Sequence, residues 1–258
     1  TGESEWGSCN FIHSRREVQC FLQSAANYWL EEYHFDGIRM DAVSRLIYWQ
    51  GDPARGVNGN AVSFLQTMNA GLRRLHPTAM LIAEDSTNFP KVTAPVEYGG
   101  LGFDYKWDMG WMHDTLDYFA TPFGERPNAY GKIIFSMHYF YNELYLLALS
   151  HDEVVHGKCS LLNKMPGDYE EKFSNLRTFF GYMMAHPGKK LLFMGPEIGQ
   201  WHEWDFASQL DWYLLENKEN QQTQRFFKDI NRFYLSQSPL WDIDFSWEGF
   251  EWLVADDN

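Results

Sequence analysis

Gly37-Ile38-Arg39-Met40-Asp41-Ala42-Val43 is a short, largely apolar segment that begins at a turn and carries a carboxylate near its end, as expected of a strand that positions a reactive group. The preceding residues 14–33 repeat apolar side chains at the three- and four-residue spacing of an amphipathic helix. Ser14 and Glu17 match the capping-box pattern found at helix starts. We therefore predict a helix that lays one apolar stripe on a sheet containing this strand.

This helix-then-strand pattern recurs along the chain. Further helices are predicted through residues 62–75 and 173–183, and further strands at 80–83, 103–107, 144–149 and 191–194. Apolar strands that alternate with amphipathic helices indicate an α/β fold built of parallel βαβ units. The strands end in polar chemistry, which is typical of a (β/α)8 TIM barrel but also of an open doubly wound sheet. No glycine-rich phosphate loop follows a strand, which favours the barrel.

The composition narrows the possible partners and location. The 35 acidic and 21 basic residues give a net charge of −14, which argues against nucleic acid or an anionic membrane and suits a neutral substrate. No apolar run reaches the length of a membrane span. The three cysteines form neither a metal-binding nor a disulfide pattern, so a reducing, cytoplasmic location is expected.

Asp41, Glu84 and Asp152 follow three different predicted strands. In a barrel these strand ends meet at one mouth. Retaining glycoside chemistry requires an ionised carboxylate nucleophile and a protonated carboxyl about 5–5.5 Å apart. Arg39 lies two residues before Asp41, on the same side of the strand, where its charge would keep Asp41 ionised. Burial would favour the protonated form of Glu84 and suit it as the acid.

Two other catalytic classes are less well supported. His151 and His156 suggest zinc, but zincins place two histidines four residues apart on a helix, whereas these are five apart and follow a strand. The chain also contains no Gly-x-Ser-x-Gly elbow of the serine hydrolases. We therefore expect no metal at this site and no serine nucleophile.

Several stretches resemble known enzyme families. Three are similar to signature regions of the α-amylase superfamily of glycoside hydrolases, namely residues 37–43, Ala83-Glu84-Asp85-Ser86 and Leu149-Ser150-His151-Asp152-Glu153-Val154. Five longer stretches resemble 1,4-α-glucan (glycogen) branching enzymes in particular, at residues 99–103, 106–118, 151–158, 165–168 and 186–195.

The resemblance implies roles for individual residues. Asp41 would be the nucleophile, Glu84 the general acid/base, and Asp152 the carboxylate that holds the hydroxyls of the reacting sugar. The substrate-binding residues would be Arg39, His151 and Glu153. The family cleaves an α-1,4-glucan and transfers the severed segment to a 6-hydroxyl in glycogen biosynthesis, with no cofactor chemically required. The implied partner is α-1,4-glucan: glycogen, amylose or maltooligosaccharides.

The resemblance also implies a domain organisation. Residues 1–238 would form the fourth to eighth strands of a barrel in a longer protein, and residues 239–258 the start of a C-terminal β-domain with a strand at 250–254. We expect the segment by itself to lack branching activity. Two alternatives share the three carboxylates: a hydrolase of the same superfamily (an amylase or maltooligosyltrehalose trehalohydrolase) and an inactive glucan-binding remnant.

Overall fold

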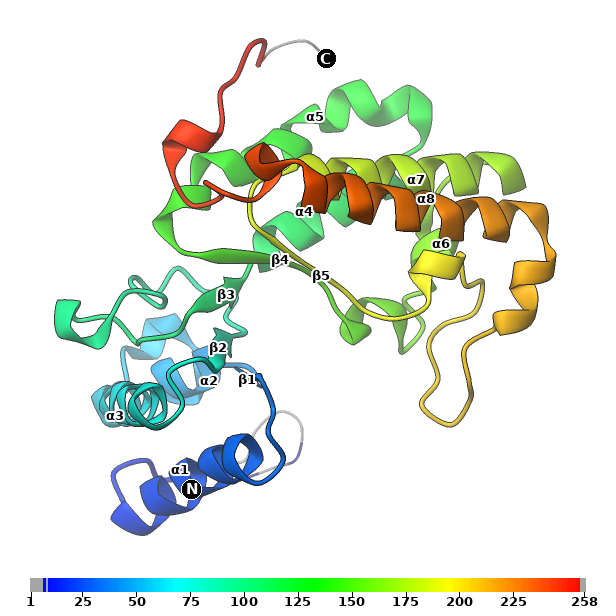
Figure 1. Ribbon diagram of the computed structural model, residues 1–258. Coiled ribbons are helices and arrows are strands. Elements are labelled where there is room, and N and C mark those ends of the chain that lie inside the picture. Colours follow the sequence, from blue (N-terminus) through cyan, green and yellow to red (C-terminus); the bar gives the residue numbers. More distant parts are fainter. Residues whose placement is uncertain (1–6, 8, 256–258) are drawn as a thin grey trace. The chain divides into compact units, whose positions relative to one another are not determined.

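The computed structural model describes Gly7 and residues 9–255, and the chain forms two units (Figure 1). The first unit contains residues 1–107 and 142–144, and the second contains residues 108–141 and 145–258. In both units short parallel strands alternate with helices, which confirms the predicted α/β class. Within the described residues, no helix combines the length and apolarity needed to cross a membrane.

The first unit is built on three parallel strands. Its elements in chain order are α1 (Arg16–Glu31), β1 (Gly37–Met40), α2 (Ser44–Ile47), α3 (Gly59–Leu75), β2 (Met80–Ala83) and β3 (Tyr105–Trp107). β1 pairs with β2 from Gly37 opposite Met80 to Met40 opposite Ala83, and β2 pairs with β3. Gly37 permits this approach, because a Cβ there would collide with the Met80 carbonyl oxygen.

The core of the first unit lies between its sheet and α3. The amphipathic pattern of α3 buries Phe64, Leu65 and Leu72, which pack in one cluster with Leu81 of β2. The Asn58 side chain caps this helix by accepting a hydrogen bond from the Ala61 N–H. The helix and the strand that follows it therefore form as the apolar periodicity predicts.

The second unit has two parallel strands and longer helices. Its elements are α4 (Met109–Ala120), α5 (Arg126–Phe135), β4 (Tyr145–Leu149), α6 (Leu161–Lys164), α7 (Tyr169–Ala185), β5 (Lys189–Leu192) and α8 (Lys218–Ser236). β4 is buried along its whole length and pairs with β5, while α7 and α8 lie side by side (Figure 1). The core is rich in aromatic rings, with Phe180 of α7 meeting Phe227 of α8 at 4.3 Å between centroids.

Two local predictions are wrong, and a third is confirmed only in part. Ser14 does not cap α1, because the Arg15 carbonyl accepts the first helical hydrogen bond and Arg15 has no side-chain cap. The apolar stripe of α1 packs on the core only along one edge: Leu30 is buried in the cluster that contains Leu81, and Leu22 and Ala26 pack against it, whereas Trp29 and Tyr33 are exposed. Residues 250–254 form no strand.

Candidate active site

The first two strands place Asp41 and Glu84 at the same edge of the sheet. Met40 and Ala83 are paired in register, so the residue that follows each strand emerges side by side with the other. The backbone continues this pairing, because the Glu84 N–H donates to the Met40 carbonyl (3.0 Å) and the Val43 N–H donates to the Glu84 carbonyl (2.8 Å). The structure thus brings together two of the three predicted carboxylates.

Arg39 joins these two carboxylates. Its Nη1 donates to Asp41 Oδ1 at 2.8 Å and also forms an ion pair with Glu84 Oε2. Because each hydrogen bond is at most about 3 Å long, the two carboxylate oxygens lie within about 6 Å of each other. This spacing suits a retaining pair and is too short for most inverting pairs. The guanidinium lies 4.6 Å from the centroid of the Trp107 ring, a cation–π contact that holds it in place.

The two carboxylates differ in environment. The Asp41 side chain is 73% exposed, whereas the Glu84 side chain is 17% exposed. The residue after Asp41, Ala42, has a φ of 44°, in the left-handed region that non-glycine residues rarely adopt. Such strain costs about 1–3 kcal/mol and is concentrated at functional sites. Asp41 is thus open to solvent, whereas Glu84 is shielded from it.

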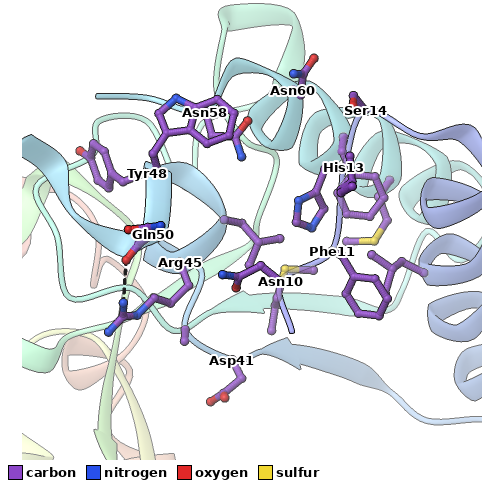
Figure 2. Close-up of a pocket in the computed structure, with 18 of the residues that line it drawn as sticks. Asn10, Phe11, His13, Ser14, Asp41, Arg45, Tyr48, Gln50, Asn58 and Asn60 are labelled. Carbon is purple, nitrogen blue, oxygen red and sulfur yellow. Dashed lines mark hydrogen bonds between the residues drawn. The ribbon is translucent and has the colours of Figure 1, made fainter. Parts of the chain in front are cut away.

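A pocket of about 700 Å³ lies next to Asp41 in the first unit. Figure 2 shows Asp41 at one end of it and Asn58 and Asn60 at the other. Its wall includes the side chains of His13, whose pKa is lowered by burial, and Trp49, whose ring is half exposed. Neutral amides beside an aromatic face provide the hydrogen bonds and the stacking surface that an uncharged sugar needs.

The other predicted residues lie in the second unit, directly after β4. His151 Nε2 is 3.3 Å from Asp152 Oδ1, and both side chains are partly exposed. The Asp152 N–H donates to Ser150 Oγ at 3.2 Å, which fixes the start of this turn. Glu153, in contrast, is buried, with Oε1 3.7 Å from Lys158 Nζ. The described contacts of Glu153 are therefore structural.

Glu203 holds the loop that follows this turn. Its carboxylate accepts hydrogen bonds from the backbone N–H groups of Gly157 (3.0 Å) and Cys159 (2.6 Å), which lower the pKa of Glu203. Both residues, like His156 before them, have positive φ angles. The loop conformation thus depends on a carboxylate 44 residues or more away along the chain.

Sequence reasoning assigned no individual role to Lys106 or Trp107, although both lie in a stretch that carries the resemblance. Lys106 is buried in β3 and ion-paired to Asp85, and Trp107 supports Arg39. A lysine inside an otherwise apolar strand is the signal that could have drawn attention to this pair, because buried charges need partners.

Comparisons with known proteins give a consistent picture. No protein-family model matches the chain. It is 50% identical over 248 residues to a 1,4-alpha-glucan branching enzyme GlgB of Bacillus caldolyticus, covering 96% of the chain and 37% of that protein. With the enzyme of the same name from Bacillus subtilis it shares 49% identity over 248 residues, covering 40% of that protein. The chain spans about two fifths of the length of these curated relatives.

Solved structures establish the fold. An alpha-amylase from Geobacillus thermoleovorans in complex with acarbose superposes with a TM-score of 0.58 at 18% identity, covering 91% of this chain and 48% of that one. The type III pullulan hydrolase from Thermococcus kodakarensis gives a TM-score of 0.62 at 20% identity, covering 88% and 37%. The chain has the α/β fold of these TIM-barrel enzymes and corresponds to part of such a barrel. Over nearly its whole length the chain is thus similar, at about half identity, to a part of the 1,4-alpha-glucan branching enzymes GlgB.

Proposed function

We propose that this chain carries the catalytic residues of a 1,4-α-glucan branching enzyme, which cuts an α-1,4-glucan and transfers the severed segment to a 6-hydroxyl. The observation that carries the proposal is the contact of one guanidinium, Arg39, with both Asp41 and Glu84 at neighbouring strand ends. The similarity of 96% of the chain to 1,4-alpha-glucan branching enzymes supports transfer, rather than hydrolysis, as the outcome.

In the first half-reaction, the Asp41 carboxylate attacks C1 of the glucose unit on the donor side of the scissile bond. The bond from C1 to the leaving 4-oxygen breaks, and Glu84 gives its proton to that oxygen. The products are a glucosyl ester on Asp41 and a shortened chain with a free 4-hydroxyl. Arg39, bound to both carboxylates, places a positive charge beside the attacking group.

In the second half-reaction, the ionised Glu84 removes the proton from the 6-hydroxyl of an acceptor glucan. The 6-oxygen attacks C1, the ester breaks, and Asp41 is released as a carboxylate, so both groups return to their starting states. We assign the partly exposed Asp152 and His151 of the second unit, and separately Arg39 of the first, to binding sugar hydroxyls. We propose that Glu153 contributes to substrate binding indirectly, by supporting this turn from its buried position beside Lys158.

The pocket beside Asp41 supports a neutral polysaccharide as the substrate. Its lining is mainly amide, imidazole and aromatic, its arginine, Arg45, donates to the Gln50 carbonyl, and the net charge of the chain is −14, which disfavours an anionic ligand. We also propose a cytoplasmic location, since the cysteines Cys9, Cys20 and Cys159 are free thiols. Residues 1–238 as catalytic barrel and 239–258 as the start of a β-domain remain our proposal for the domains.

The test is to incubate the complete enzyme with amylose. We expect the iodine complex to bleach and shift to the blue while the number of reducing ends stays nearly constant, because transfer makes one glycosidic bond for each bond broken. A debranching enzyme added afterwards should release short chains. The Asp41→Asn variant is the control and should leave the iodine colour unchanged. Reducing ends that rise in step with iodine loss would establish a hydrolase instead.

A further inference from the structure

A buried ion pair links β3 to Asp85, the residue that follows Glu84. Lys106 of β3 donates from Nζ to Asp85 Oδ2 at 2.8 Å, and the two side chains are only 5% and 0% exposed. Asp85 follows Glu84 in the chain, and Ala83, the residue before Glu84, is paired in register with Lys106. The residues on both sides of Glu84 are thus held by one residue of β3.

The same lysine organises the turn that follows Glu84. Its Nζ also donates to the Thr87 carbonyl at 2.7 Å. The Thr87 hydroxyl in turn donates to the Asp85 carboxylate at 2.9 Å, and the Thr87 N–H donates to it at 3.2 Å. One ammonium group, one carboxylate and one threonine therefore close the turn as a fully bonded network, in which a single unpaired member would be costly.

The opposite side of Glu84 is fixed by β1. Its N–H donates to the Met40 carbonyl and its carbonyl accepts from the Val43 N–H. With Lys106 on the other side, the Glu84 backbone is held between two strands, and only its side chain is free to turn towards Arg39. The next residue of β3, Trp107, packs on the Arg39 guanidinium that contacts Glu84.

We propose that Lys106, acting through Asp85, is a positioning residue that holds the Glu84 carboxyl in line with the leaving oxygen. The inference rests on the function proposed above for Glu84. A buried ion pair is seldom the most stabilising choice, because an apolar pair of similar volume often stabilises a fold as well or better. What the pair supplies is a fixed geometry, which general acid catalysis needs since the proton must lie within hydrogen-bond reach of its acceptor.

The experiment compares two reactions of the complete enzyme. Transfer from amylose needs a proton from Glu84, whereas glucosyl transfer from α-glucosyl fluoride to azide needs none, because fluoride leaves and azide attacks without acid or base help. In Lys106→Met, kcat on amylose should fall roughly 10- to 100-fold relative to kcat on the fluoride, as expected for a displaced catalytic group. The KM for amylose should change little. The Glu84→Gln variant, which lacks the acid itself, should show the largest fall in the ratio of kcat on amylose to kcat on the fluoride.

The matched control is Lys189→Met in β5. Lys189 also donates to one carboxylate, Asp244, and one backbone carbonyl, that of Trp241, but it lies at the start of its strand. Its loss should lower the unfolding temperature and leave the ratio of the two rates unchanged. Should Lys106→Met fold poorly, the double variant with Asp85→Leu removes both charges, and the same fall in the ratio is expected.

Equal loss of both reactions in the Lys106 variants, or an altered unfolding temperature with an unchanged ratio, would overturn the positioning role. A wild-type enzyme that acts on neither substrate would instead overturn the proposed function, and this inference with it. The activity of the wild-type enzyme therefore distinguishes failure of the proposed function from failure of the positioning role.

Discussion

His186 makes the stability of the second unit depend on pH. The imidazole is 6% exposed and lies between Phe140 and Tyr182, with ring centroids 5.4 and 5.7 Å away. Its Nδ1–H donates to the Pro187 carbonyl at 2.8 Å, which leaves Nε2 to accept from the Ser136 hydroxyl at 2.9 Å. Burial lowers the pKa of His186 from 6.5 to about 4, against the smaller opposing effect of the Pro187 hydrogen bond.

The sign and size of the effect follow from this pKa. Between about pH 6.5 and 4 the unfolded chain binds a proton on His186 that the folded chain does not, so stability is lost as the pH falls through this window. The full difference of the two pKa values is worth about 3 kcal/mol, of which about 2 kcal/mol is already lost at about pH 5.

The assay is urea unfolding, followed by tryptophan fluorescence, at about pH 7.5 and about pH 5. The His186→Gln variant keeps a donor and an acceptor but cannot titrate, so its unfolding free energy should drop by about 2 kcal/mol less than that of the wild type between these values. The control, His138→Gln at an exposed imidazole in the same unit, should retain the wild-type drop, because His186 is still present. Equal drops in the wild type and in His186→Gln would refute the reasoning.

Two further predictions concern the carboxylates and a helix start. Asp41→Asn and Glu84→Gln should each lower the rate on amylose by a factor of roughly 100 or more, and α-glucosyl fluoride should restore glucosyl-enzyme formation only in the Glu84 variant. The opposite pattern of rescue would exchange their roles. Asp168→Ala should destabilise the protein by about 1 kcal/mol in urea unfolding, because Asp168 and Glu171 form the capping box of α7. Ser14→Ala, at a residue that caps no helix, should have almost no effect, and equal losses would contradict this assignment.

Local sequence patterns predicted the helices and strands in which apolar residues recur at a single spacing. The strand at residues 80–83 has the predicted bounds, and the helix predicted over residues 62–75 ends at residue 75 but begins earlier, at Gly59. β5 was expected to begin at Leu191 but begins at Lys189. Its two lysines were expected to lie before the strand because they are charged. In the structure Lys189 pairs with Asp244, and the Lys190 ammonium donates to the His186 carbonyl. α5 and α8 were not predicted: α5 has no buried residue, and α8 is amphipathic but mainly polar, with few apolar residues to mark its buried face.

The three carboxylates were found because a polar residue at the end of an apolar strand is a local signal. The sequence next to each carboxylate did not show which other side chains surround it. Arg39 was placed correctly beside Asp41 by its two-residue spacing, but its contact with Glu84 joins residues 45 positions apart. The pairs formed by Glu203 with the loop at Gly157, and by Lys106 with Asp85, are likewise remote in the chain.

The sequence by itself determined the strand and helix periods, the strand-end positions of Asp41, Glu84 and Asp152, and the resemblance that led to the family. The tertiary structure decided that β3 holds the residues on both sides of Glu84, that one guanidinium contacts both Asp41 and Glu84, and that α1 buries only one edge of its apolar stripe. The physical reason is that periodicity reports which face of an element avoids water, whereas the partner of a buried charge is fixed by strand register and packing between distant segments.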